Sequence, residues 1–265
     1  MATLAPSALR RPAWATDTYF FLVMAVAMAA FNVAGFSLFA AMGISSFGAP
    51  LWVHVHALLF FGWVVLFVTQ AWLAASGRVA LHRPLGWLAL GWVAAMIVVG
   101  TLTTMWSVQR GFVPFFFTPA QFLLLNPLSV VVFAGLVIAG FVHRRDRLWH
   151  PRLIVCGMAA IMGPSIGRML PMPLLIAGVP IPYFATAIVA GTLVFPLVGA
   201  GRDLLKRGGI HPAWLVGMAA IAGMELVNMA LAQSAPVAAV YEWAVAGTPG
   251  AMLDPHAYGP PPPPP

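Results

Sequence analysis

Two histidines, His54 and His56, lie near the start of a long apolar run between Pro50 and Ala75. On a helix of about 3.6 residues per turn, side chains two residues apart point roughly 200° away from each other. The two imidazoles therefore cannot bind one metal ion without breaking the helix. We expect one of them to face the bundle interior, where it would line a site for a polar or anionic ligand. The alternative is one hydrogen-bonded packing histidine and one interfacial histidine.

Charged residues also occur inside two later apolar runs, as Arg168 in MGPSIGRMLPMP and as Glu225, with Asn228 one turn further on. Charges within membrane spans are costly, and they usually face the interior as pairs or as functional groups. We therefore predict an ion pair between Arg168 and Glu225, to which Asn228 could contribute. This pair would be either structural or part of the same ligand site as His56.

Three further histidines, His82, His150 and His211, each precede an apolar run. A proline follows each of them within two residues (Pro84, Pro151 and Pro212). Proline suits the first turn of a helix, so each histidine is expected at or near a helix start. If these helices adjoin, the three imidazoles would meet as metal ligands or proton acceptors, with Asp203 and His143 in the same layer. Alternatively, they only cap helices among the lipid headgroups.

The residues do not identify a cofactor, and haem and a transition metal are the two candidates. The chain lacks the H-x-x-H and H-x-x-x-H pairs of histidine-rich di-iron enzymes, and it has no haem attachment motif. His54 and His56 have no histidine partner at equal depth in another predicted span. A nucleophile–base pair, a phosphate loop and a spaced carboxylate dyad are also absent, which leaves enzymatic activity uncertain.

The composition determines the class of protein. Hydrophobic residues make up 62% of the 265 residues and charged residues only 7%, whereas a soluble domain carries roughly 25% charged residues. Such a chain cannot solvate its own surface in water, so the lipid bilayer is the expected partner, with other membrane proteins as further candidates. The net charge of +7 comes from basic residues in short loops, which argues against nucleic acid. The single cysteine, Cys156, allows no internal disulfide.

Seven stretches reach the roughly 20 mostly apolar residues that a helical crossing needs. Lipid offers no partner to backbone groups, and runs without strict alternation favour helices over a barrel. We therefore predict an all-α polytopic transmembrane helix bundle of about seven spans: 19–42, 51–75, 85–107, 120–142, 152–174, 181–200 and 212–233. Glycines and prolines between residues 163 and 171 should loosen or kink the fifth span. Residues 1–18 would precede this membrane domain of residues 19–234, and an external tail, 235–265, would end in polyproline.

The basic residues predict the orientation. With seven spans, one side of the membrane receives the N-terminus and the loops 76–84, 143–151 and 201–211. Eleven of the 13 basic residues lie on that side: Arg10, Arg11, Arg78, Arg83, Arg144, Arg145, Arg147, Arg152, Arg202, Lys206 and Arg207. Lys and Arg are enriched in cytoplasmic loops. We therefore expect a cytoplasmic N-terminus, an external C-terminus and a location in the bacterial inner membrane.

Several blocks of the chain resemble a group of uncharacterised bacterial inner-membrane proteins of about seven spans. The group shows H-x-H, then G-R-x-x-x-H-R-x-L-G, H-x-R-L with P-x-x-x-R, and a late R-x-x-H-P. The matching positions are His54, His56, Gly77, Arg78, His82, Arg83, Leu85, Gly86, His150, Arg152, Leu153, Pro164, Arg168, Arg207, Gly208, His211 and Pro212. In the last block the spacing departs by one residue. The chain is similar, more loosely, to the membrane proteins grouped as DUF2306. The resemblance implies fold and location and brings no activity.

Together these features predict an integral membrane protein that binds a ligand or cofactor, as a redox or metal accessory. Two alternatives stay open. A small transporter or channel would use Arg168 and Glu225 in its translocation path, and the kinked fifth span favours it. A non-catalytic accessory subunit of a larger membrane complex would bind lipid or pigment and perform no chemistry.

Overall fold

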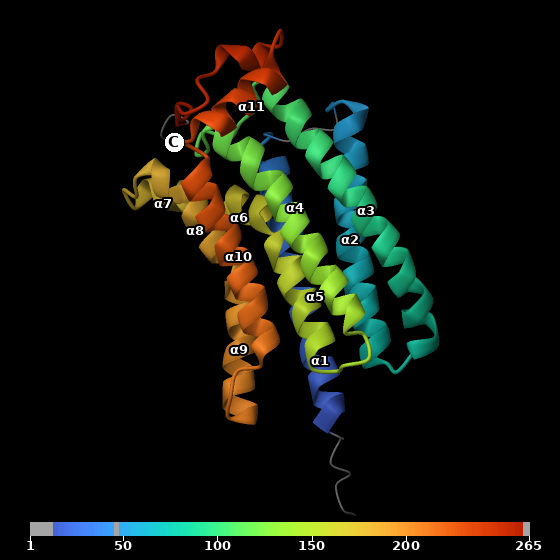
Figure 1. Cartoon of the computed structure of the whole chain (residues 1–265). Helices are drawn as coiled ribbons and strands as arrows, with labels where there is room; N and C mark the ends of the chain where they lie inside the picture. Colours follow the sequence, from blue (N-terminus) through green and yellow to red (C-terminus); the bar gives the residue numbers. More distant parts are fainter. Residues whose placement is uncertain (1–12, 45–47, 262–265) are drawn as a thin grey trace, which may run out of the picture.

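A computed structural model describes residues 13–44 and 48–261 of the chain, with side chains from residue 17 onward. Regular structure in this part of the chain is entirely helical. Four long helices come first, and they stand side by side in Figure 1: α1 (Ala13–Ala41), α2 (Leu51–Ala75), α3 (Val79–Gln109) and α4 (Pro119–Val142). The predicted all-α polytopic bundle is confirmed.

The second half of the bundle is built from shorter pieces. Its elements are α5 (Trp149–Ala160), α6 (Gly163–Met169), α7 (Pro171–Ile176), the 3₁₀ turn Ile181–Tyr183, α8 (Phe184–Thr192), α9 (Val194–Arg207) and α10 (Pro212–Leu231). In the described residues, six helical segments are long and apolar enough to cross a membrane: Asp17–Ala41, α2, α3, α4, Ile181–Arg207 and α10. The remaining predicted span, 152–174, is the one that is divided into α5, α6 and α7.

The break in this span has a local cause. α5 ends at Ala160, and α6 starts afresh at Gly163 with Pro164 in its first turn. Pro171 then starts α7 in the same way. Proline lacks the N–H that would continue a helix, although it is tolerated in a first turn. The kink predicted from these residues is therefore present, and Arg168 lies on the short helix between the two interruptions.

The two ends of the bundle differ in charge. The start of α1 and the turns α2–α3, α4–α5 and α9–α10 lie at one end, at the bottom of Figure 1. We call it the basic end, because its described residues include Arg78, Arg83, Arg144, Arg145, Arg147, Arg152, Arg202, Lys206 and Arg207. Arg10 and Arg11 lie outside the described residues. We call the opposite end, which carries Arg110, the distal end.

Close helix contacts depend on small residues. A Cβ on Gly217 of α10 would lie 2.3 Å from Cys156 Sγ of α5, and one on Gly35 of α1 would lie 2.6 Å from the Ser165 carbonyl oxygen of α6. Without a Cβ these backbones approach each other, as is common where helices pack in membranes. The core around them contains fully buried large side chains: Met28, Met96, Phe133, Met158, Phe184, Trp214 and Ile221.

The predicted tail is folded against the distal end. Its helix α11 (Ala235–Val245) and the 3₁₀ turn Pro249–Met252 pack on α3 and α4, at the top of Figure 1. The buried Tyr241 hydroxyl donates to the Gly250 carbonyl at 2.9 Å, and Gln109 Nε2 donates to the Ala244 carbonyl at 3.0 Å. Residues 235–261 therefore form a cap. The last prolines, 262–265, lie outside the described residues.

Candidate functional site

Arg168 is directed toward α1. Its Nη1 donates to the Pro164 carbonyl at 2.7 Å, and its guanidinium carbon lies 4.0 Å from the centre of the Phe36 ring and 5.2 Å from that of Phe39. Its Nε is buried and has no hydrogen-bond partner. The side chain thus uses one backbone carbonyl and two aromatic faces, and its buried Nε–H has no partner.

The predicted ion pair between Arg168 and Glu225 is not formed. Glu225 on α10 accepts a hydrogen bond from Thr186 Oγ1 of α8 at 2.7 Å and one from Asn228 Nδ2 at 3.3 Å. The break before α6 sets the helical phase of Arg168, and α6 packs on α1, so its guanidinium faces that helix. Asn228 contacts Glu225 as expected, yet it does not bridge to Arg168.

Arg168 has no acidic counter-ion in the described part of the chain. That part includes all six acidic residues of the sequence: Asp17, Asp146, Asp203, Glu225, Glu242 and Asp254. Its ion pairs use only Asp17 and Asp203, both at the basic end. The arginine is therefore a cation within the bundle whose charge is not neutralised by the protein.

His56 lies at the same end of the bundle as this cation. Its ring stacks on Phe60 with centroids 4.3 Å apart, and it interacts electrostatically with Arg168. The Nδ1 atom of His56 is buried without a hydrogen-bond partner. His54 is half-buried on another face of α2, as the two-residue spacing predicts. His56 and Arg168 therefore interact through their charges, and each presents one buried nitrogen with no hydrogen-bond partner.

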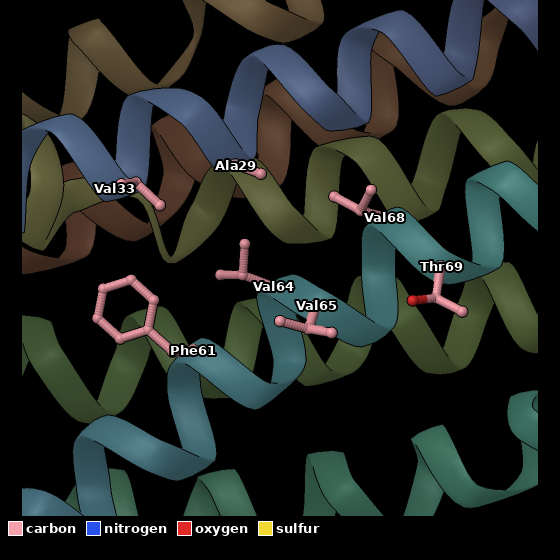
Figure 2. A pocket seen from close by; sticks show the side chains of 7 residues that line it. All are labelled: Ala29, Val33, Phe61, Val64, Val65, Val68 and Thr69. Carbon is pink, nitrogen blue, oxygen red and sulfur yellow. The ribbon is translucent and has the colours of Figure 1, made fainter.

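An apolar groove between α1 and α2 ends close to this pair. Its volume is about 290 Å³, and it is lined by Ala29, Val33, Phe61, Val64, Val65, Val68 and Thr69 (Figure 2). Val65 is 66% exposed, so the groove opens to the outer surface of the bundle. At one end Phe61 packs edge-on against Phe36 at 5.0 Å, and Arg168 lies over that same Phe36 ring. The Phe36 ring therefore connects the end of the groove to Arg168.

A second polar cluster, at the basic end, is fully satisfied. Arg152 of α5 donates two hydrogen bonds to Asp203 of α9, Nε to Oδ2 at 2.7 Å and Nη2 to Oδ1 at 2.6 Å. Trp214 Nε1 donates to the same carboxylate at 2.9 Å, and Arg152 Nη1 donates to the Leu148 carbonyl at 2.8 Å. Sequence reasoning placed Asp203 with the histidines and missed this pair. The sequence signal that could have predicted this pair is two opposite charges, Arg152 and Asp203, at the same end of two otherwise apolar helices.

Two of the three helix-start histidines meet. The rings of His82 and His150 are 6.2 Å apart, whereas His211 packs edge-on against Trp149 at 5.3 Å and caps α10 by accepting from Ala213 N. Burial and, next, the charge of Arg152 lower the pKa of His211. His143 stacks on the same Trp149. In residues 13–44 and 48–261 no group of three or more His, Cys, Asp or Glu side chains could hold a metal ion.

Comparison with protein-family models, with curated proteins and with solved structures finds no match to this chain.

Proposed function

We propose that this multi-pass membrane protein binds an anionic amphiphile. Its headgroup would lie against Arg168 and His56, and its apolar chain would occupy the groove between α1 and α2. The observation that carries the proposal is the unneutralised Arg168, whose Nε is buried without a partner. Of the functions that the sequence predicts, this proposal keeps ligand binding. It adds the chemical class of the ligand, an anionic amphiphile.

The chemistry of the headgroup follows from the donors. An arginine presents several N–H groups in a planar fork, which suits carboxylate and phosphate oxygens. A charge without a partner in apolar surroundings is costly, and charged residues within membrane spans are functional by default. An anionic oxygen at Arg168 Nε would neutralise the charge of the guanidinium and accept a hydrogen bond from its unsatisfied N–H. His56 Nδ1 supplies a second polar contact beside it.

The depth of the site suits an amphiphile. His56 is the sixth residue of α2, so at 1.5 Å per residue it lies about 8 Å from the start of the helix. That depth corresponds to the boundary between headgroups and hydrocarbon. From Phe61 to Thr69 the groove follows α2 toward the basic end for about 12 Å. A charged head at Arg168 would therefore direct its chain toward the middle of the bundle.

The orientation decides which leaflet supplies the ligand. We infer that the basic end faces the cytoplasm of a bacterial inner membrane, since Lys and Arg are enriched on that side. The distal end, with Arg168 and His56, would then face outward, and the amphiphile would enter from the outer leaflet.

A transport path through Arg168 and Glu225 is less favoured. The two side chains contact different helices, α1 and α8 respectively, and Glu225 already has two hydrogen-bond partners. An accessory subunit that binds lipid is compatible with the site, because such a subunit and the proposed protein would both bind an anionic lipid.

Native mass spectrometry of the full chain, released from nanodiscs that contain phosphatidylglycerol and phosphatidylcholine, tests the proposal. We expect one retained phosphatidylglycerol per wild-type chain, and retention lowered at least about tenfold in Arg168→Gln, which removes a charged contact of about 1.5–3 kcal/mol. Arg110→Gln is the matched control, since Arg110 lies at the same end over the ring of Trp106. Equal retention in wild type and Arg168→Gln, or loss in the control alone, would contradict the proposal.

A further inference from the structure

At the basic end, two imidazoles from different helices are anchored in the same way. His82 Nδ1 lies 3.3 Å from the Gln70 carbonyl oxygen, and His150 Nδ1 lies 2.8 Å from the Gly140 carbonyl oxygen. A carbonyl oxygen can only accept, so Nδ1 of each ring must carry the hydrogen. In the neutral ring Nε2 then keeps its lone pair. Metal-binding histidines are oriented by this same contact between the other ring N–H and a carbonyl.

The spacing of the two rings suits one shared metal centre. Their centroids are 6.2 Å apart and their planes are nearly perpendicular, at 88°. Two imidazoles that bind one metal from opposite sides, each at about 2.0–2.1 Å, have ring centres roughly 6 Å apart. The observed ring separation is therefore compatible with one metal held between the two imidazoles.

A third acceptor belongs to the same cluster. The Gln70 side chain donates through Nε2 to the His82 carbonyl at 3.2 Å, and its Oε1 is buried with no hydrogen-bond partner. Gln70 thus anchors the His82 ring by its backbone and leaves a side-chain oxygen unsatisfied beside it. The cluster thus offers two imidazole lone pairs and one buried amide oxygen without a hydrogen-bond partner, and all three can bind an electron-poor partner.

We infer that His82 and His150 bind one transition-metal centre between their Nε2 atoms. Imidazole ligands suit copper and iron, whereas Mg²⁺ and Ca²⁺ prefer carboxylate and carbonyl oxygens, of which this cluster offers one amide. The shared chemistry is a metal that accepts imidazoles on opposite sides, supplied either by a copper ion or by the iron of a haem. The inference goes beyond the proposed function, because the residues lie at the opposite end from Arg168 and the two tests fail independently.

Metal titration of the purified full-length protein tests the inference. Chelator-treated protein in detergent is titrated separately with Cu(I) and with haemin, and bound metal is counted by elemental analysis and haem by its Soret band. We expect one equivalent per chain in one of the two titrations, which also identifies the source. In His82→Ala and in His150→Ala the affinity should fall at least about tenfold, whereas His143→Ala, an exposed histidine at the same end, should bind as wild type does.

A second measurement on wild-type protein removes the dependence on variants that fail to fold. Diethyl pyrocarbonate modifies accessible imidazoles, and mass spectrometry locates the modification. The bound metal or haemin should protect His82 and His150 and leave His143 unprotected. Binding of neither probe, or modification of His82 and His150 that is the same with and without the bound probe, would overturn the inference.

Discussion

The guanidinium of Arg168 lies 4.0 Å from the centre of the Phe36 ring, with no carboxylate of the described chain within ion-pair distance. A cation–π contact contributes about 0.5–2 kcal/mol. A buried charge without an acidic partner is costly, and the Nε–H of Arg168 still has no hydrogen-bond partner. Phe36 therefore satisfies the side chain only in part, and an anionic headgroup would supply the missing partner.

Filling the groove should separate chain binding from headgroup binding. Ala29 lines the groove between α1 and α2, so Ala29→Phe would occupy the space assigned to the apolar chain. We expect binding of long-chain phosphatidylglycerol to fall several-fold while binding of a short-chain analogue changes little, as measured by native mass spectrometry. Val98→Phe, at an exposed position on α3, is the control. Equal loss for both chain lengths would argue against this assignment of the groove.

The buried pair at the basic end should dominate stability. Asp203 accepts from Arg152 and from Trp214, and both charged side chains are almost fully buried. Arg152→Met removes the closer of the two cations that pair with the buried Asp203 carboxylate, since Arg207 Nε lies 3.4 Å from Oδ1. We therefore expect a loss of about 3 kcal/mol in the free energy of unfolding in detergent. Adding Asp203→Leu to that variant should recover part of the loss. A single variant as stable as wild type would show that the pair is not important for folding.

Close packing of α1 on α6 predicts that alanine substitution lowers stability at Gly35 and not at Gly91. A Cβ on Gly35 would meet the Ser165 backbone oxygen at 2.6 Å, whereas one on Gly91 of α3 meets nothing within 4 Å. Backbone atoms cannot move aside as a flexible side chain can, so Gly35→Ala should destabilise the protein by about 1–3 kcal/mol. Gly91→Ala should be neutral or stabilising. Thermal unfolding in detergent compares the two, and similar midpoints would contradict the packing.

Asp146 makes the start of α5 sensitive to acid. Its carboxylate accepts from the backbone N–H groups of Leu148, at 2.7 Å, and Trp149, at 3.1 Å, and these bonds hold the pKa of Asp146 below its ordinary value of 3.8. Since the folded pKa is the lower one, the stabilisation is complete above 3.8 and is lost as the pH falls through the folded value.

The comparison with Asp146→Asn isolates this group, because asparagine also caps a helix start and does not titrate. On acidification from neutral pH, the unfolding midpoint of wild type should fall further than that of Asp146→Asn. The same fall in both proteins would show that Asp146 does not contribute to the acid sensitivity.

The helices could be predicted from the sequence because their signals are local. An apolar run predicts α2 at 51–75, where the structure has Leu51–Ala75, and the glycine and proline residues around Arg168 predict the divided fifth span. The prolines beside His150 and His211 predict helix starts, and the structure begins α5 and α10 within one residue of these positions. α3 instead begins at Val79, so His82 and Pro84 lie inside the helix.

The partners of the polar residues could not be predicted, since they depend on contacts between helices. The direction of Arg168 depends on the helical phase after the break at Gly163, which no apolar pattern encodes. The pairing of Arg152 with Asp203 requires that α5 and α9 adjoin, and residue spacing does not reveal this contact. Neither the cap formed by residues 235–261 nor the buried Tyr241 within it has a sequence signal beyond a short apolar piece.

The most direct test of the central proposal is a density map of the full chain in nanodiscs that contain phosphatidylglycerol. We predict an elongated density along the groove between α1 and α2, with its head within hydrogen-bond distance of Arg168 Nε and His56 Nδ1. A map at comparable resolution that shows Arg168 hydrogen-bonded only to protein or water, with the groove occupied no differently from the rest of the lipid-facing surface, would contradict it.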